Sequence, residues 1–132
     1  MKVMNTLHTS AYWNQKVKSL ALAGEAVPVG ITLYHPRRNP GYPLRHNLKL
    51  LAPDKALFKI DDYAAFRVPF LELLELRWPF IQSELENLSG LYPELPLILL
   101  CFDRVDGPGD WCHRQIVAEF LAAKLAQPVT EL

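Results

Sequence analysis

The sequence predicts a three-layer α/β sandwich around a small, mostly parallel sheet. Two observations predict it: strand-like and helix-like segments alternate along the chain, and residues 95–102 form a near-continuous apolar run. Such a run is typical of a strand covered on both faces, as in a parallel sheet between helices. The 132 residues, 50% of them hydrophobic, suit one compact domain over residues 1–132.

The first part of the chain predicts a strand, a helix and a second strand. Residues 2–8 are typical of a short strand, and residues 12–24 carry apolar side chains at helical spacing, with Ser10 as the expected N-cap. Residues 26–34 are β-branched and apolar, and Pro28 should lie near the start of that strand because it has no N–H for the ladder. This order predicts a right-handed βαβ unit.

The middle of the chain predicts a long loop and then a broken helical region. Residues 35–53 contain four prolines, too many for a regular element. Residues 54–89 have a helical pattern that we expect to be broken twice, at Pro69 and at Pro79. Three acidic residues are candidate N-caps here: Asp54, and either Asp61 or Asp62.

The last part of the chain predicts the centre of the sheet and the site. Residues 95–102 should be the middle strand, residues 111–126 a helix capped by Asp110, and residues 128–132 a last short strand. In open α/β sheets ligands bind beyond the carboxyl ends of the strands. The turn between the middle strand and the last helix is therefore the expected place of a site.

The triplet Cys112-His113-Arg114 lies at the start of that last helix. A helix N-terminus stabilises a thiolate and attracts anions, so Cys112 is a candidate nucleophile, His113 an acid or base and Arg114 an anion clamp. Adjacent helical residues point about 100° apart, so we expect Cys112 and Arg114, rather than His113, to face the pocket. The alternative is a structural role, in which Arg114 pairs with a carboxylate or with carbonyl oxygens at strand ends.

The two cysteines limit the chemistry. Two cysteines do not make a disulfide framework, and with four histidines the chain does not form paired zinc knuckles, so we expect reduced thiols. Cys101 is predicted to be a core residue, and a Cys101–Cys112 redox pair is disfavoured because eleven residues is no recognised redox spacing. A cysteine-type phosphatase is excluded, since Ala118 stands where its arginine would be needed.

Charge balance and hydropathy exclude other classes of protein. Fourteen Lys and Arg balance fourteen Asp and Glu, which argues against a strongly charged binding surface as a whole. The chain shows neither the apolar core of a signal peptide nor a run of about 20 apolar residues. We therefore expect a cytoplasmic protein without membrane contact, and the sequence does not predict an oligomeric state.

The leading hypothesis is a small enzyme or ligand-binding domain for a small anionic ligand, nucleotide-like or otherwise phosphorylated. The predicted catalytic residues are Cys112 and His113, and no metal or cofactor is predicted. The predicted ligand-binding residues are Thr9, Ser10, Arg37, Arg38 and Arg114.

Two other hypotheses come from different classes of protein. Residues 34–49 contain basic and aromatic side chains and no acidic one, which suits a nucleic-acid-binding module. The other is an interaction protein that uses aromatic residues of the broken helical region, namely Phe66, Phe70, Trp78 and Phe80.

Three motifs carry a family resemblance. They are Thr9-Ser10-Ala11-Tyr12, Leu51-Ala52-Pro53 and the closing run LLCFDR…WCHRQIVAEFL, of which the last is the most specific. By these motifs nearly the whole chain resembles the bacterial and viral domain-of-unknown-function family 488. The resemblance implies a small α/β domain with a polar cluster built from the Thr-Ser end, the basic loop and the Cys-His-Arg turn, and it implies no particular activity. The chain departs from the family pattern in its longer turn DRVDGPGDW and its proline-rich residues 35–43, and both bear on the shape of a pocket.

Overall fold

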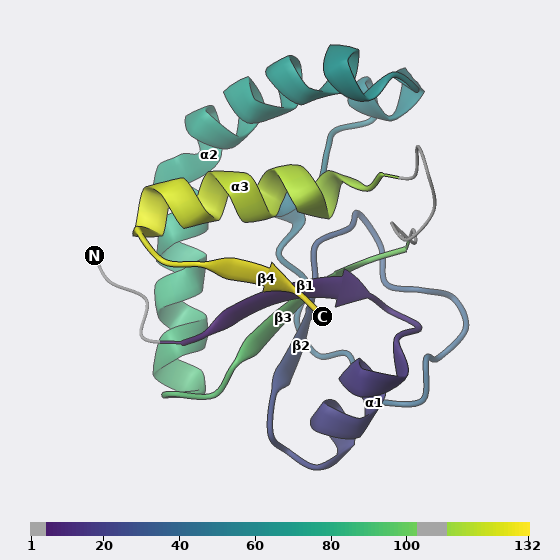
Figure 1. The fold of residues 1–132 in the computed structure, drawn as a ribbon, viewed down its shortest axis with the longest axis vertical. Helices are drawn as coiled ribbons and strands as arrows, with labels where there is room; N and C mark the ends of the chain where they lie inside the picture. The colour runs from purple at the N-terminus through teal and green to yellow at the C-terminus, as the bar shows by residue number, and fades with distance from the viewer. Residues whose placement is uncertain (1–4, 103–110) are drawn as a thin grey trace.

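The protein is described by a computed structural model that covers residues 5–102 and 111–132. Its strands and helices alternate as the sequence predicts (Figure 1). In chain order they are β1 (Leu7–Ala11), α1 (Gln15–Leu22), β2 (Val27–Gly30), α2 (Tyr63–Leu91), β3 (Leu97–Cys101), α3 (His113–Leu125) and β4 (Val129–Glu131), with short 3-10 turns at Lys49–Leu51 and Leu57–Lys59.

The strands of the described residues form one parallel sheet in the order β2-β3-β1-β4. Strand β3 lies between β2 and β1, with Leu97 opposite both Leu7 and Val27. All five of its residues are buried, as expected for a strand that is covered on both faces. The predicted parallel sheet, with residues 95–102 near its centre, is confirmed.

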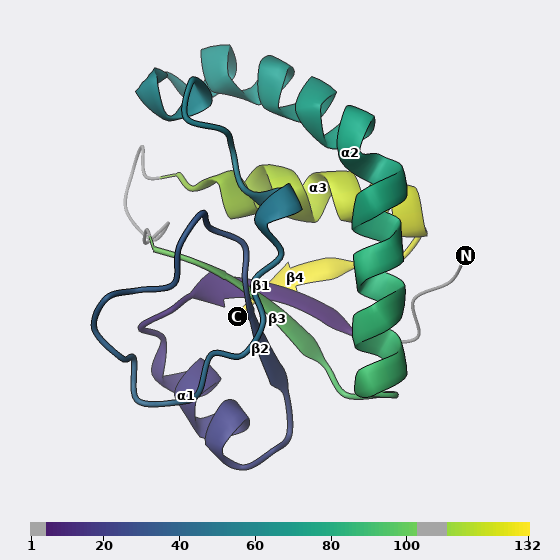
Figure 2. The same cartoon turned by 180° about the vertical axis from the view of Figure 1, so that it is seen from behind.

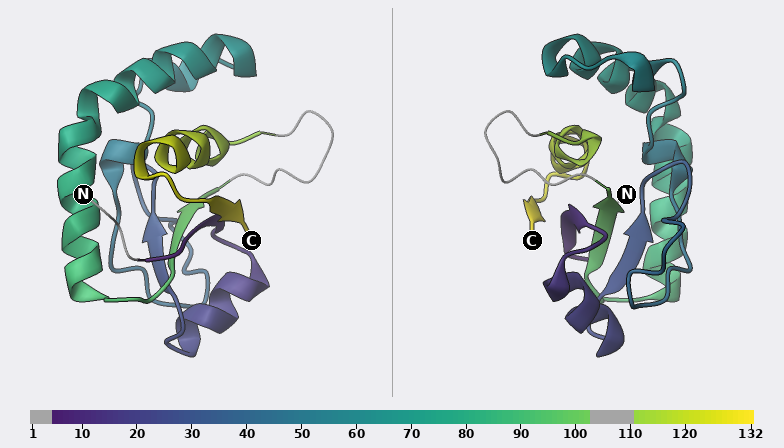
Figure 3. Two further views of the ribbon diagram at one scale, coloured as in Figure 1. Left: turned by 60° about the vertical axis from the view of Figure 1, so that its left-hand side comes forward. Right: turned by 90° about the vertical axis from the view of Figure 1, so that its right-hand side faces the viewer.

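Helices cover both faces of the sheet, which confirms the three-layer sandwich. Helices α2 and α3 lie on one face and α1 on the other (Figures 1–3). The alternation of side chains along β3 matches these layers, because Leu99 and Cys101 belong to the core under α2 and α3, whereas Ile98 and Leu100 pack on the α1 side. Cys101 thus points toward the face where α3 begins.

Helix α1 begins later than the sequence predicts. Its N-cap is Asn14, whose side chain accepts a hydrogen bond from the N–H of Lys16, so the expectation that Ser10 caps this helix is wrong. Ser10 still pairs with Leu100 in the β1–β3 ladder, and its hydroxyl accepts a hydrogen bond of 3.0 Å from Asn14 Nδ2. The strand therefore extends over the residue that a capping pattern alone would assign to the helix.

Helix α2 is one continuous helix, so the expectation of two breaks is wrong. Asp62 is its N-cap and accepts a hydrogen bond of 2.8 Å from Ala65 N, as predicted. Pro69 and Pro79 lie inside the helix. The helix axis bends along its length (Figure 2). Each proline removes one intrahelical hydrogen bond, but a buried apolar face runs past both of them and holds the two halves on the core. That face comprises Phe66, Phe70, Leu74, Ile81, Leu85 and Leu88.

The loop after β2 is irregular, as predicted, and folds back along that strand. Residues 31–46 contain neither helix nor strand. The loop returns to β2 at Gly30, whose N–H donates to His46 O at 2.9 Å and whose carbonyl accepts from Leu48 N at 2.7 Å. This return places the loop beside the carboxyl end of the sheet.

Candidate functional site

The carboxyl end of β3 meets the start of α3, and the two cysteines join there. Cys101 is the last residue of β3 and Cys112 is the N-cap of α3. A disulfide links them across the eleven-residue separation. The expectations of reduced thiols and of an unpaired Cys101 are therefore wrong in this structure. Sequence separation was a poor guide, because α3 returns over the sheet and brings its first turn to the strand end from which the chain left.

His113 is held as a neutral ring beside this pair. The side chain is 8% exposed, and its Nε2–H donates to the carbonyl oxygen of Ile31 at 2.6 Å. Burial lowers the pKa of His113 to about 4, against the raising effect of the Ile31 hydrogen bond, and the nearby Arg114 lowers it further. Because the carbonyl takes the Nε2 proton, the other ring nitrogen, Nδ1, carries the lone pair and lies 3.7 Å from Cys112 Sγ. The His113 ring makes a T-shaped contact with Phe70, which fixes its orientation.

Arg114 points away from His113, toward β4, and binds other side chains of the protein. It is 1% exposed and forms an ion pair of 2.8 Å with Glu131 Oε2, while its Nε lies 3.0 Å from Oε1. Thr9 donates to the same carboxylate at 2.7 Å. Nη1 of Arg114 donates to Cys101 Sγ at 3.0 Å. The pairing with a carboxylate is the arrangement expected from the structural alternative, and the role of anion clamp stays a prediction.

Cys112 and His113 line the same hollows, which corrects the expectation that they face apart. The 100° rule applies within a helix, and Cys112 is an N-cap with extended backbone, at φ −140° and ψ 154°. We name the smaller hollow, of about 150 Å³, the cysteine cavity. It is lined by Thr32, Leu33, Tyr34, Phe58, Cys101, Phe102, Cys112 and His113. A larger hollow of about 310 Å³ lies against the same two residues and is lined also by Pro53, Leu57, Phe58, Ile60, Asp61, Phe66 and Trp111.

A network of hydrogen bonds fixes the wall of the cysteine cavity. The hydroxyl of Thr32 donates to Tyr34 O at 2.6 Å and therefore accepts from Tyr12 Oη at 2.7 Å. Asn47 donates to the carbonyl of Thr32 at 2.8 Å, and Tyr42 donates to the carbonyl of Tyr12 at 2.6 Å. Burial raises the pKa of Tyr12, so its hydroxyl stays protonated and holds this geometry.

The other predicted ligand-binding residues lie outside both hollows. Ser10 bonds Asn14 on the α1 side of the sheet. Arg37 is exposed, and the guanidinium of Arg38 stacks on the Trp13 ring at 4.8 Å from its centre. Among the described residues, the structure thus does not bring these side chains together with the cysteines. Asp110, the predicted cap of the last helix, falls outside the described residues, and the N-cap of α3 is Cys112 instead.

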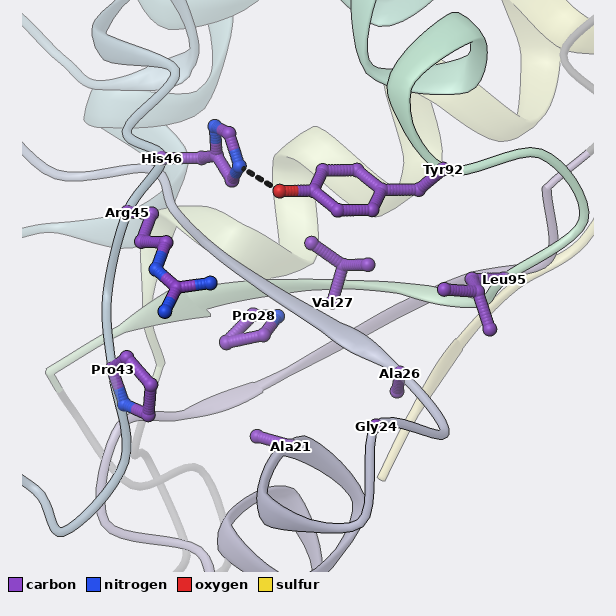
Figure 4. A pocket seen from close by; sticks show the side chains of 10 residues that line it. All are labelled: Ala21, Gly24, Ala26, Val27, Pro28, Pro43, Arg45, His46, Tyr92 and Leu95. Carbon is purple, nitrogen blue, oxygen red and sulfur yellow. Dashed lines mark hydrogen bonds between the residues drawn. The ribbon is translucent and has the colours of Figure 1, made fainter.

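Part of the predicted basic loop lines a separate pocket of about 160 Å³ (Figure 4). Here His46 Nε2 bonds the hydroxyl of Tyr92 at 2.6 Å. Burial lowers the pKa of His46, and the charge of Arg45 lowers it further. The rest of the lining is apolar or small: Ala21, Gly24, Ala26, Val27, Pro28, Pro43 and Leu95. These two basic residues therefore border an apolar hollow, and nucleic-acid binding by the loop stays a prediction.

Cys101 and the Ile31 carbonyl are the functional groups that sequence reasoning missed. Cys101 is the last residue of the buried strand β3, so it lies at the carboxyl edge of the sheet, where ligands of such folds bind. This position is the sequence signal that could have indicated a pairing with Cys112. The Ile31 carbonyl gives no sequence signal, because any residue supplies one.

None of the helices in the described part of the chain has the length and apolar character needed to cross a bilayer. Comparisons with protein-family models, curated proteins and solved structures found no match to this chain. The resemblance to domain-of-unknown-function family 488 accordingly stays a prediction, and the function is inferred from the site alone.

Proposed function

We propose that this protein is a thiol–disulfide exchange domain for small thiols, in which Cys101 and Cys112 are the reacting pair. The observation that supports this most directly is that the two cysteines are joined at the carboxyl edge of the sheet and line a cavity there. Ligands of open α/β sheets bind at that edge. The cysteines are 1% and 3% exposed, so a reagent reaches them through the hollows of about 150 and 310 Å³ beside them, which favours a small thiol over a protein surface.

The exchange is balanced with two molecules of the small thiol. A thiolate attacks Cys112 Sγ, the bond between the cysteines breaks, and its electron pair leaves on Cys101 Sγ. A second thiolate then attacks the mixed disulfide at the sulfur of the small molecule and releases Cys112. The products are the small-molecule disulfide and the protein dithiol, and the reverse sequence reduces such a disulfide.

The neighbours of the two sulfurs suit the two roles. Nη1 of Arg114 donates to Cys101 Sγ at 3.0 Å, so the guanidinium stabilises the thiolate that leaves. A leaving thiol with a lower pKa leaves faster. Cys112 stands at the N-terminus of α3, where the helix dipole favours its thiolate.

A redox titration tests the proposal. The protein is equilibrated in buffers of a small thiol and its disulfide, quenched with an alkylating reagent and analysed by mass spectrometry. We expect Cys101 and Cys112 to become alkylated together as one two-electron couple, with a reduction potential between about −180 and −270 mV, the range of exchange proteins. A potential below about −300 mV, the range of structural disulfides, contradicts the proposal.

Replacement of Arg114 tests the role of its guanidinium. In Arg114→Met the Cys101 thiolate loses a charge-assisted hydrogen bond worth about 1.5–3 kcal/mol. That loss corresponds to a potential roughly 30–60 mV more negative, because 30 mV is about 1.4 kcal/mol for two electrons. Arg38→Met is the matched control, since Arg38 stacks on Trp13. Equal potentials in the two variants would remove Arg114 from the mechanism.

A further inference from the structure

The two cysteines of the disulfide lie beside a third possible metal ligand, the imidazole of His113. In the described residues, Cys101, Cys112 and His113 form a buried cluster whose ligand atoms all lie within 4.8 Å of one another. Two thiolates and an imidazole are a ligand set that Zn²⁺ prefers. We propose that, when the two cysteines are reduced, the protein binds one Zn²⁺ through Cys101 Sγ, Cys112 Sγ and His113 Nδ1.

The distance between the Cys112 and His113 donor atoms fits a tetrahedral zinc ion, and all three donor atoms lie within 4.8 Å of one another. With Zn–S bonds of about 2.3 Å and Zn–N bonds of about 2.0–2.1 Å, sulfur and nitrogen on one ion lie roughly 3.6 Å apart. Cys112 Sγ and His113 Nδ1 lie 3.7 Å apart. The two sulfurs bound to one zinc ion lie roughly 3.8 Å apart by the same geometry. Reduction of the disulfide frees the two sulfur atoms to move apart to this distance.

The tautomer of His113 is already the one that a zinc ligand needs. A metal-bound histidine almost always donates its other ring N–H to a carbonyl or carboxylate. His113 Nε2 donates to the Ile31 carbonyl at 2.6 Å, which leaves the Nδ1 lone pair on the side of Cys112. The T-shaped contact between this ring and Phe70 restricts its rotation.

The charges around the site also suit a divalent ion. Among the described residues, two thiolates and Zn²⁺ sum to zero and the adjacent Arg114–Glu131 pair is also neutral. The hydrogen bond from Arg114 to Cys101 Sγ is the outer contact that orients a thiolate ligand. All three ligand residues line the cysteine cavity, so the fourth position of the ion is left for a water or a small molecule from that cavity.

This inference uses the same two cysteines as the proposed exchange and needs them reduced, but it does not need small thiols to reduce them. The test begins with protein reduced by a strong phosphine, and alkylation of a sample confirms two free thiols before any metal is added. Zn²⁺ is then titrated against a chromophoric chelator. We expect one equivalent to bind to the reduced protein and none to the oxidised protein.

Variants identify the nitrogen ligand. His113→Gln keeps an amide N–H for the Ile31 carbonyl and removes the Nδ1 lone pair, so we expect zinc affinity to fall at least tenfold. His8→Gln is the matched control, because His8 bonds Thr130 in the strand pair β1–β4 and is outside the cluster. In the reduced wild type, Co²⁺ should give the charge-transfer absorption of a thiolate-bound ion.

The outcomes separate this inference from the proposed function. Reduced wild type that binds no more Zn²⁺ than the oxidised form overturns the metal site and leaves thiol exchange in place. Equal affinities of His113→Gln and wild type overturn the three-ligand set. A disulfide that resists small thiols, in a protein whose phosphine-reduced form binds Zn²⁺, overturns thiol exchange and supports the metal site.

Discussion

Loss of the Glu131 carboxylate should destabilise the fold through the charge it leaves on Arg114. Arg114 is 1% exposed, and three hydrogen bonds to Glu131, of 2.8, 3.0 and 3.1 Å, hold its guanidinium. Glu131→Gln keeps the shape of the side chain and removes the charge. The buried guanidinium then loses the Glu131 carboxylate, and loss of a partner by a buried charge is one of the few single changes that cost several kcal/mol.

The structure sets the size of the effect. Breaking a buried ion pair by removing one partner costs about 3–5 kcal/mol. The Glu131 side chain is 40% exposed, so water screens part of the charge, and we expect a loss of about 2–3 kcal/mol. For a domain of this length, that corresponds to a fall in melting temperature on the order of 10 °C. Arg114→Met with Glu131→Gln should lose less than the sum of the single variants, by roughly 1–2 kcal/mol.

Urea unfolding of the four proteins of this cycle gives the coupling energy. Glu75→Gln is the control, because Glu75 pairs with Lys124 at a similar distance of 2.8 Å but is 57% exposed. Its loss should cost less than about 0.5 kcal/mol and should shrink with added salt. If Glu131→Gln unfolds at the same urea concentration as Glu75→Gln, the buried guanidinium does not depend on this carboxylate and the reasoning fails.

Two further predictions concern His113 and Gly30. The pKa of His113 is about 4 in the folded protein, and its ordinary value is 6.5. Between these pH values the unfolded state therefore binds more protons than the folded state. The free energy of unfolding should fall by up to about 3 kcal/mol as the pH drops from 6.5 to 4. His113→Gln should flatten this part of the urea-midpoint profile, and an unchanged profile would contradict the assignment. A Cβ on Gly30 would lie 2.6 Å from both Asn47 Oδ1 and Tyr12 Oη, so Gly30→Ala should cost about 1–3 kcal/mol in urea unfolding. Gly90→Ala meets nothing within 4 Å in a helix and should raise stability by up to about 1 kcal/mol, and equal effects at the two glycines would contradict the close approach.

The layers of the fold were predictable because each depends on a local pattern. The apolar run at residues 95–102 is long enough for one strand and has too few polar residues for a strand with a solvent-exposed face. It therefore predicted that β3 lies inside the sheet. Asp62 was predictable as an N-cap because a capping carboxylate acts on the next turn of the chain. These features involve neighbours in sequence, and the rest of the fold changes them little.

The continuity of α2 could not be predicted from such local patterns. Pro69 and Pro79 are strong local signals against a helix, each with a cost of about 3 kcal/mol in a helix interior. What offsets that cost is burial on the sheet and α3, where Leu74 and Ile81 are fully or almost fully enclosed. Burial of one such side chain contributes about 1.5–3 kcal/mol. Whether the apolar residues on either side of a proline are buried depends on the tertiary fold. Their burial therefore could not be predicted from the sequence alone.

The site shows the same limit at the scale of three residues. Consecutive residues at the start of α3 reach three different strands: Cys112 reaches β3 through Cys101, His113 reaches the end of β2 through Ile31, and Arg114 reaches β4 through Glu131. Local rules predicted that Cys112 and Arg114 would face the pocket, whereas Cys112 and His113 line the same cavity. Which residues share a side depends on the strand order β2-β3-β1-β4. With β4 beside it, Arg114 pairs with an anion within the protein, Glu131. In the proposed thiol exchange, the small molecule therefore enters on the side that His113 faces, beside the loop that follows β2.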